Sequence, residues 1–468
     1  MIKFGTSGWR AIIGDGFTFE NVRRLSDAIA ETILEGDKAE RGVLFGFDTR
    51  FLSEHFAEEA AGVVAARGIR CVVSNTALPT PAVSHAIRHH GFAGAVNITA
   101  SHNPAEYNGL KFSADTGAPA PIEVTRGLEE KIAARASAPA PARRADADGL
   151  ERVDVRDEYL KQLESLVQFD AIRDAGVRVV LDPRWGTARG FYDELLTRHG
   201  IPVRVIHDRR DVTFGGQGPD VTERNLEELG RAVVEGGYTL GLACDGDADR
   251  FGVVDVDGTW ISPNLLLALL ADYLADTRGF RQGLGRTYAT TGLIDAVARH
   301  YKVPVVQTPV GFKYLGEQIL HDKVYLAGEE SAGMSMAGHV PEKDGLLAGL
   351  LAAEMTARRK CSLKRMRDDL FAKVGTRYSA RRDLRVTPEQ AARLRSHMAS
   401  PPERIGGRIV SQPTVLDGLR LDFDDGAWML MRPSGTEPVV RFYVEALTQA
   451  DLQQLLVAGE RELIGGDG

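Results

Sequence analysis

The sequence predicts an α/β protein of several domains that ends in a smaller α+β domain. Through the first three quarters of the chain, apolar β-branched runs alternate with amphipathic stretches, which is typical of βα units around mostly parallel sheets. This pattern changes near 374–381. At roughly 150 residues per domain, the 468 residues correspond to about three domains, with room for a fourth if the domains are small.

Buried strands and amphipathic helices are expected in β-α-β order throughout the first part. Three strands end in an aspartate and a turn, within Gly42–Arg50, Val177–Arg184 and Leu240–Arg250. Further strands are expected at Cys71–Ser74, Val203–Ile206, Val303–Val306 and Val324–Ala327, and helices at Phe56–Arg67, Asp157–Gln168, Leu265–Leu274 and Gly345–Arg358.

The C-terminal region has a different pattern. Two apolar runs, Leu419–Phe423 and Trp428–Met431, flank an Asp-Asp-Gly turn, and Val439–Ala446 alternates as a half-buried strand does. Leucines at helical spacing follow in Asp451–Ile464. These features predict a compact α+β unit.

One linker can be recognised from composition. Residues 133–149 are rich in Ala and Pro, alternate in charge and have no apolar face, which indicates a linker or an exposed loop. With the pattern changes above, this divides the chain into four units, 1–145, 151–256, 257–372 and 375–468.

Composition argues against several classes of partner. The chain has 57 Lys and Arg against 65 Asp and Glu, a formal net charge of −8, so no global field attracts nucleic acid or an anionic membrane. No apolar run approaches the roughly 18 residues that a membrane span needs, and the N-terminus lacks an apolar secretory segment. The three cysteines are widely spaced. We therefore expect a cytoplasmic protein in a reducing compartment.

The segment DGDADR is the first with an evident chemical use. Asp245, Asp247 and Asp249 follow a hydrophobic strand at alternate positions, so a turn can aim all three carboxylates at one hard cation. An EF-hand is excluded, because its sixth position would be Arg250 and its twelfth Val256. An aspartyl-phosphate nucleophile at Asp245 and a solvated acidic turn remain alternatives.

The segment TASHNP, with YNGLK close behind, offers a hydroxyl nucleophile. Ser101 lies in a loop after a strand-like run and lacks the G-x-S-x-G frame of a hydrolase. A hydroxyl needs activation, and a metal or a phosphoryl group on Ser101 could provide it. The alternatives are a turn or capping serine and, at Lys111, a surface lysine.

Two further loops suit phosphate. RPSGTEP, followed by Arg441, combines a guanidinium fork at Arg432 with hydroxyls and approachable backbone N–H groups. FGTSGWR, which ends in Arg10, is a similar polar loop between glycines. A Pro/Gly turn with a capping serine is the alternative reading of RPSGTEP.

A fourth loop suits a hydroxyl-rich ligand. GEESAG follows an expected strand, with GFK upstream and EKDG downstream, and its Glu329 and Ser331 can accept and donate hydrogen bonds to a sugar. Taken alone, Glu329 and Glu330 also fit the reading of exposed carboxylates at a helix N-terminus.

Taken together, these segments resemble the α-D-phosphohexomutases, the family that contains phosphoglucomutase and phosphomannomutase. Seven motifs occur in the family's order over nearly the whole chain, one or two in each predicted unit: FGTSGWR, TASHNP, YNGLK, DGDADR, TPVGFK, GEESAG and RPSGTEP. An accidental set at such spacing is very improbable, so the local alternatives lose most of their weight.

The resemblance implies a heart-shaped molecule of four domains around one cleft, with three α/β/α domains that have mixed sheets and a smaller α+β C-terminal domain. It implies that Ser101 carries phosphate and that Asp245, Asp247 and Asp249 bind one Mg²⁺ per chain together with an oxygen of the phosphoserine. The implied substrate contacts are Thr6, Ser7, Arg250, Lys313, Glu329, Ser331, Arg432, Ser434, Gly435, Thr436 and Arg441.

The implied reaction converts a hexose 1-phosphate into a hexose 6-phosphate. Phosphorylated Ser101 gives its phosphoryl group to a sugar hydroxyl, the bisphosphate turns over in the cleft, and the other phosphate returns to Ser101. Lys111 is the candidate for proton transfer, and His102 and Arg10 would hold the phosphoryl group. The loop from Arg432 to Thr436 would hold the phosphate that is not being transferred. Because this loop must accept both ends of the bisphosphate in turn, we expect a movable last domain with a hinge near Gly375.

The sugar loop favours glucose, with glucose 1,6-bisphosphate as intermediate and activator. Family members of the phosphomannomutase and glucosamine types commonly have GExSGH, whereas Ala332 and Gly333 stand at the corresponding place here, as in bacterial phosphoglucomutases. His339 could still swing into the site. Phosphomannomutase or phosphoglucosamine mutase activity, a phosphosugar hydrolase that uses Asp245, and a silent sugar-phosphate-binding protein are the alternatives. A monomer or homodimer is expected.

Overall fold

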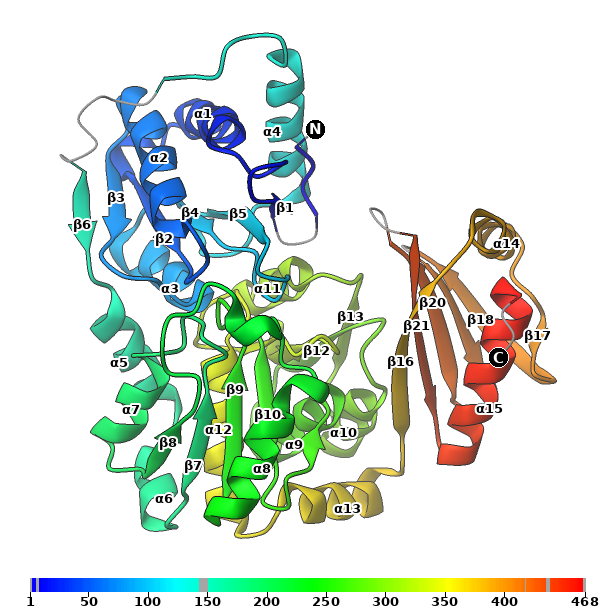
Figure 1. Cartoon of the computed structure of the whole chain (residues 1–468). Coiled ribbons are helices and arrows are strands. Elements are labelled where there is room, and N and C mark those ends of the chain that lie inside the picture. Colours follow the sequence, from blue (N-terminus) through cyan, green and yellow to red (C-terminus); the bar gives the residue numbers. More distant parts are fainter. Residues whose placement is uncertain (1, 6–7, 143–149, 417, 435–437, 466–468) are drawn as a thin grey trace.

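The computed structural model describes residues 2–5, 8–142, 150–416, 418–434 and 438–465, and these residues form four sheets (Figure 1). The expected α/β fold of four units, with mixed sheets in the first three, is confirmed. No helix in the described ranges has the length and apolar character needed to cross a membrane.

The first sheet has the strand order β1-β5-β4-β2-β3-β6. Its strands are β1 (Trp9–Ile12), β2 (Val43–Phe47), β3 (Cys71–Ser74), β4 (Gly94–Ile98), β5 (Tyr107–Ala114) and β6 (Glu151–Val153), and its helices are α1 (Phe19–Glu35), α2 (Ser53–Ala66), α3 (Thr80–His90) and α4 (Ile122–Ala134). The sequence places residues 151–153 at the start of the second unit. Instead, β6 pairs in parallel with β3, so the chain adds an edge strand to the first sheet before it leaves.

The second sheet has the order β11-β10-β9-β7-β8. Its strands are β7 (Val179–Asp182), β8 (Val203–Val205), β9 (Leu240–Cys244), β10 (Phe251–Val254) and β11 (Trp260–Ile261). Its helices are α5 (Arg156–Leu166), α6 (Phe169–Asp174), α7 (Tyr192–Arg198) and α8 (Glu227–Gly236).

The third sheet has the order β13-β12-β14-β15. Its strands are β12 (Gly283–Thr287), β13 (Val305–Thr308), β14 (Val324–Gly328) and β15 (Met334–Met336), and its helices are α9 (Pro263–Arg278), α10 (Leu293–Tyr301), α11 (Phe312–Leu320), α12 (Gly345–Arg359) and α13 (Leu363–Val374). Helix α12 is buried over nearly its whole length and packs on β9 and β10 of the second sheet. The second and third domains therefore share one hydrophobic core.

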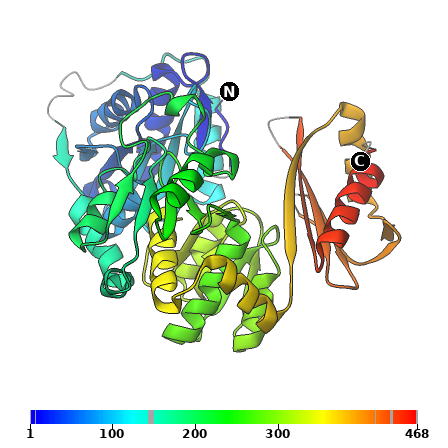
Figure 2. The same cartoon turned by 60° about the horizontal axis from the view of Figure 1, so that its bottom comes forward.

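The last sheet has the order β16-β21-β20-β19-β18-β17. Its strands are β16 (Tyr378–Arg385), β17 (Arg404–Ile405), β18 (Arg408–Val415), β19 (Leu419–Phe423), β20 (Trp428–Pro433) and β21 (Val439–Ala446). Helices α14 (Pro388–Ala399) and α15 (Gln449–Gly459) lie on the outer face, away from the other domains (Figures 1 and 2). Inner-face residues Trp428, Leu430 and Tyr443 pack against Tyr288 and Ala289 of the third domain.

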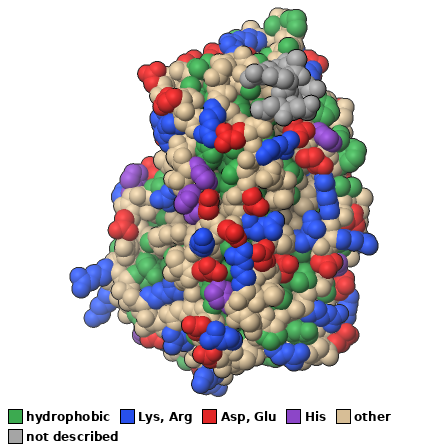
Figure 3. Space-filling view, turned by 90° about the vertical axis from the view of Figure 1, so that its left-hand side faces the viewer, with side chains coloured by type: hydrophobic (Ala, Val, Ile, Leu, Met, Phe, Trp, Pro, Cys, Tyr) green, Lys and Arg blue, Asp and Glu red, His purple; other side chains and the backbone are tan. Residues whose placement is uncertain are grey.

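Charged side chains of both signs are interspersed over the face of the first three domains that Figure 3 shows. Neither sign forms one continuous field there, which agrees with the small excess of acidic residues in the sequence.

The four main motif loops share one topological place. TASHNP joins β4 to β5, DGDADR joins β9 to β10, GEESAG joins β14 to β15, and RPSGTEP joins β20 to β21, and each of these strand pairs is antiparallel. The expected β-α-β order throughout is therefore wrong at three of these loops. The physical reason is that these loops are too short, because a crossover between parallel strands takes a dozen or more residues.

Candidate active site

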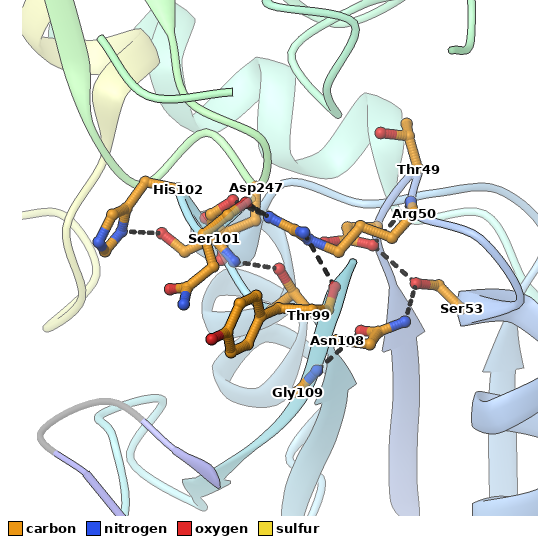
Figure 4. A network of polar contacts seen from close by, with 12 residues as sticks. Thr49, Arg50, Ser53, Thr99, Ser101, His102, Asn108, Gly109 and Asp247 are labelled. Carbon is orange, nitrogen blue, oxygen red and sulfur yellow. Dashed lines mark hydrogen bonds and ion pairs between the residues drawn. The ribbon is translucent and has the colours of Figure 1, made fainter. Parts of the chain in front are cut away.

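Ser101 is held at the end of β4 in an unusual backbone conformation. Its φ is 52°, in the left-handed region that residues other than glycine rarely adopt. The side chain is buried, and its Oγ donates a hydrogen bond of 2.7 Å to Oδ2 of Asp245. Nδ1 of His102 lies 3.4 Å from the same Oγ (Figure 4). The loop thus aims a hydroxyl from the first domain at a carboxylate of the second.

The three aspartates of DGDADR converge as their spacing predicts. Asp245, Asp247 and Asp249 are buried, and one carboxylate oxygen of each lies within 4.8 Å of the others. Two of their oxygens, Oδ1 of Asp247 and Oδ1 of Asp249, are buried without a hydrogen-bond partner in the described ranges. Gly246 lets the turn approach Ser101, because a Cβ there would stand 2.7 Å from the Ser101 carbonyl oxygen.

This carboxylate cluster fits a divalent cation. Burial, and then repulsion from Asp247 and Asp249, raise the pKa of Asp245 well above its ordinary value. A hard cation such as Mg²⁺ takes oxygen ligands, and its positive charge would offset both the burial of the carboxylates and their mutual repulsion. The unpartnered carboxylate oxygens supply the donor atoms that such an ion requires.

Two buried lysines balance the aspartates. Nζ of Lys111, on β5, lies 2.6 Å from Oδ2 of Asp247 and 2.8 Å from Oδ2 of Asp249. Nζ of Lys343 lies 3.3 Å from Oδ2 of Asp249 and donates to Oε1 of Glu342 at 2.5 Å. Burial alone would lower the pKa of each lysine, but the carboxylates outweigh it and raise both. These ammonium groups hold the pKa of Asp249 below its ordinary value against the effect of burial.

Two arginines stand beside the centre. Arg10, on β1, donates from Nη1 to Oδ1 of Asn103 at 2.6 Å, next to the Ser101 loop. The backbone N–H of Arg250 donates to Oδ1 of Asp245 at 3.0 Å. Burial, and then the positive charges of Arg250 and Arg10, lower the pKa of His102 well below its ordinary value, so this imidazole is neutral at pH 7.

The third domain contributes the loop between β14 and β15. Glu329 is buried, and its Oε1 accepts a hydrogen bond of 3.0 Å from the N–H of Gly311. Burial, and then repulsion from Glu330, raise the pKa of Glu329 to about 7, although Lys343 and Arg250 oppose the shift. Ser331 is half-buried. Lys313, on α11, lies with its ammonium 5.1 Å from the centre of the Tyr314 ring.

The last domain contributes two half-buried arginines. Arg432 on β20 and Arg441 on β21 face each other directly across the strand pair, and the N–H of Ser434 donates to the carbonyl of Val439 at 2.8 Å. We call Arg432, Ser434 and Arg441 the phosphate clamp, after the role that the sequence predicts for them. The other predicted substrate contacts in these loops, Thr6, Ser7, Gly435 and Thr436, lie outside the described residues.

Glu445, on the inner face of the last sheet, fastens the clamp domain to the third domain. It is fully buried and accepts hydrogen bonds from the Thr291 hydroxyl, from the N–H of Gly292 at 2.9 Å and from Nε1 of Trp428 at 3.0 Å. The first two donors belong to the third domain, so this carboxylate bridges the two domains.

Comparison with known families agrees with this arrangement. Models for phosphoglucomutase/phosphomannomutase match the chain in order: α/β/α domain I over residues 1–139, α/β/α domain II over 157–258, α/β/α domain III over 262–374, and the C-terminal domain over 383–459. The chain belongs to the phosphoglucomutase/phosphomannomutase family.

Relatives in this family span almost the whole chain. A phosphoglucomutase of Komagataeibacter xylinus is 31% identical over 96% of this chain and 88% of its own length. A phosphoglucosamine mutase of Thermobifida fusca is 31% identical over 97% of this chain and 96% of its own. The crystal structure of a Thermus thermophilus protein, described as a phosphomannomutase, is 32% identical, covers 99% of both chains and superposes with a TM-score of 0.85.

Family membership establishes the class of reaction. The protein is a phosphohexomutase, an isomerase that acts on sugar phosphates, and its aspartate cluster is suited to hold a metal. Because the three relatives are named for three different sugars, the comparisons determine the reaction and leave the hexose open.

Sequence reasoning missed part of the mutase centre. Lys343 and Glu342 lie in EKDG, which the sequence marks only as a flank of the sugar loop. Thr80, at the start of α3, donates from Oγ1 to Oδ2 of Asp247 at 2.6 Å, and nothing in its local sequence marks this contact. The sequence did contain a signal for Lys343, because the charged run Glu342–Asp344 stands between an apolar strand and a largely apolar helix, where charged residues are unusual.

Proposed function

We propose that this protein is a Mg²⁺-dependent phosphohexomutase that interconverts glucose 1-phosphate and glucose 6-phosphate through a phosphorylated Ser101. The observation that carries the proposal is the 2.7 Å contact between Ser101 Oγ and Asp245, beside two buried carboxylate oxygens that have no partner in the described ranges. A nucleophile so close to a cation site is what phosphoryl transfer requires.

Asp245, Asp247 and Asp249 would hold Mg²⁺ together with an oxygen on Ser101. When bound, the ion would neutralise negative charge on the transferring phosphoryl oxygens. The protein's own share is positioning, because the left-handed Ser101 and the Gly246 turn already bring the hydroxyl and the carboxylates together.

In the first transfer, the bond between phosphorus and Ser101 Oγ breaks and a bond to a sugar hydroxyl oxygen forms. The proton of that hydroxyl must leave, and Lys111 is our candidate for its transfer. Its ammonium donates to Oδ2 of Asp247 at 2.6 Å, so it could pass a proton to that carboxylate as it takes up the proton of the sugar, with the reverse in the second transfer. His102 and Arg10 would hold the phosphoryl group. Glucose 1,6-bisphosphate is the resulting intermediate, and its other phosphate then returns to Ser101.

The remaining loops would bind the sugar and its second phosphate. Glu329 and Ser331 would contact sugar hydroxyls, with Arg250 and Lys313 at the sides of the cleft. The phosphate clamp, together with Gly435 and Thr436 of the same motif, would hold the phosphate that is not being transferred, and Thr6 and Ser7 are further proposed substrate contacts. Paired charge-assisted hydrogen bonds from arginines suit this role.

Two features support glucose over the other hexoses. The sugar loop lacks the histidine of GExSGH. His339, which could replace it by its position in the sequence, is fully buried and engaged with Asp344, with Nε2 2.7 Å from Oδ2. The alternative, a phosphomannomutase or phosphoglucosamine mutase, is favoured by the names of relatives.

The mechanism is tested by mass spectrometry of the purified protein after incubation with glucose 1,6-bisphosphate. We expect one added phosphate on the peptide that contains Ser101 and loss of turnover in Ser101→Ala. Full turnover in Ser101→Ala would refute the phosphoserine mechanism, and release of inorganic phosphate without isomerisation would favour a hydrolase that uses Asp245.

Specificity is tested in coupled assays with glucose, mannose, glucosamine and N-acetylglucosamine 1-phosphates. The expected order has glucose 1-phosphate first in kcat/KM. A higher kcat/KM for any of the others would refute the assignment of glucose while leaving the mutase mechanism intact.

A further inference from the structure

Arg50, which follows β2, uses all of its N–H donors inside the protein. Its side chain is 0% exposed. Nη2 donates to the carbonyl oxygens of Ser101 at 2.7 Å and Asn103 at 2.6 Å, and Nη1 donates to those of Pro104 at 2.7 Å and Tyr107 at 2.9 Å. Nε donates to Oδ2 of Asp48 at 3.1 Å. One guanidinium thus fixes four carbonyl groups of a single loop.

That loop is the one that presents Ser101. The left-handed φ of 52° at Ser101 is unfavourable for a residue with a side chain, so something outside the residue must maintain it. The Ser101 carbonyl is confined between Arg50 on one side and the Gly246 turn on the other. With the carbonyl fixed, the hydroxyl of Ser101 donates to Asp245.

Arg50 is itself held from two domains. In the first domain, Oδ1 of Asp48 accepts from the N–H of Arg50 at 2.9 Å and from the hydroxyl of Ser53 at 2.7 Å. From the second domain, the ring of Phe214 lies 5.0 Å from the guanidinium carbon, and Arg210 donates from Nη2 to the backbone carbonyl of Arg50 at 3.1 Å. The guanidinium therefore has little freedom to move.

We propose that Arg50 is a positioning residue for phosphoryl transfer, which fixes the main chain of the Ser101 loop so that Oγ stays aligned with the aspartate cluster. This rests on the proposed role of Ser101. Arg50 contacts the Ser101 loop through backbone carbonyls, and its rigid fork of donors cannot be replaced by a single ammonium group.

The second domain offers a matched control. Arg184 follows β7 as Arg50 follows β2, its side chain is also 0% exposed, and its N–H donates to Oδ1 of Asp182 at 2.8 Å. Its guanidinium donates to the carbonyls of Gly218 at 2.6 Å and Asn225 at 2.9 Å. The loop that it holds contains no atom that we place in the reaction, so Arg184→Lys reproduces the structural cost of losing such a guanidinium.

The experiment compares Arg50→Lys with Arg184→Lys in the full chain. We expect both variants to lower the melting temperature by similar amounts. Arg50→Lys should lower kcat by about 100-fold with KM changed less than about threefold, since misplacing a reacting group by about 1 Å costs this much. Arg184→Lys should lower kcat by less than about fivefold. The rate at which glucose 1,6-bisphosphate phosphorylates Ser101 can be measured from the intact mass of the protein. This rate should fall with kcat in Arg50→Lys and stay near the wild-type rate in Arg184→Lys.

Equal losses of kcat in the two variants, or unchanged phosphorylation kinetics in Arg50→Lys, would overturn the proposal. If Arg50→Lys does not fold, Asp48→Asn takes its place, and a wild-type phosphorylation rate there would overturn it as well. Ser101→Ala is measured alongside: turnover without Ser101 would refute the mutase mechanism itself, whereas an inactive Ser101→Ala with a fully active Arg50→Lys would refute only the role of Arg50.

Discussion

The reaction centre and the phosphate clamp are built on opposite principles. The reaction centre, contributed by the first three domains, consists of Ser101, Lys111, Asp245, Asp247, Asp249 and Lys343, all of them buried. The clamp consists of half-buried residues on two strands of a domain that meets the others through one face. The groups that we propose for the chemistry are therefore preorganised in a buried interior, whereas the proposed binding of the second phosphate would depend on the placement of the last domain.

This difference suits a reaction in which one substrate turns over between two transfers. The atoms that react must keep one geometry, so burial and hydrogen bonds to fixed groups favour them. In the proposed reaction, the clamp accepts a phosphate from either end of the sugar, and we expect a hinge at Gly375, whose φ is 90°, to let the last domain adjust. Substitutions in the reaction centre should therefore lower mainly kcat, whereas substitutions in the clamp should act mainly on KM.

The largest effect is expected at the aspartate cluster. Asp247→Asn removes one negative charge from the site that we propose for Mg²⁺, and its kcat should fall by about 100- to 1,000-fold. Removal of the metal from the wild-type protein with a chelator should lower kcat by a similar factor. Asp257→Asn is the control, because it makes the same change in an exposed turn. Turnover at the wild-type rate in chelator would contradict the metal site.

The clamp should show a smaller effect of a different kind. Arg432→Gln removes a charge-assisted contact to the second phosphate, so kcat/KM should fall by about 10- to 100-fold, mainly through KM. The slow hydrolysis of phosphorylated Ser101, followed by mass spectrometry, should stay unchanged, since it needs only the reaction centre. Faster or slower hydrolysis in this variant would show that the two regions are not independent.

The contact between the last two domains should matter less again. Glu445→Gln weakens three hydrogen bonds to a buried carboxylate, which costs about 1–3 kcal/mol of unfolding free energy, and kcat/KM should fall by about 3- to 10-fold. Glu460→Gln provides the comparison, because Glu460 pairs with Arg382 within the last domain. If both variants lower kcat/KM equally, the domain contact has no special part in placing the clamp.

The smallest effect concerns Glu329, which lies on the loop between β14 and β15. Burial and Glu330 raise the pKa of Glu329 to about 7, so between its ordinary value and pH 7 the folded protein holds a proton that the unfolded chain has released. Stability should therefore decline as pH rises through this window, by up to about 3 kcal/mol. Urea unfolding at pH 5 and pH 8 should show a smaller decline in Glu329→Gln, and an identical decline would contradict the raised pKa.

Local patterns predicted much of the fold. The strands Cys71–Ser74, Leu419–Phe423 and Val439–Ala446 occur with the expected bounds, because their alternation or apolar run reports burial directly. Pairing partners were harder to predict. The short strand Glu151–Val153 joins the first sheet across the linker, and α12 covers a sheet of the preceding domain, since both depend on surfaces that come from distant parts of the chain.

The sequence by itself determined which loops we propose for the chemistry, because a nucleophile, a carboxylate triplet, a sugar loop and an arginine loop are local combinations of residue types. Only the tertiary structure decided how they meet. It placed all four loops between antiparallel strands, brought Lys343 to Asp249, and put Arg50 against a loop distant from it in the chain. The physical reason is that hydrogen bonds and ion pairs between distant segments depend on packing, which no local pattern encodes.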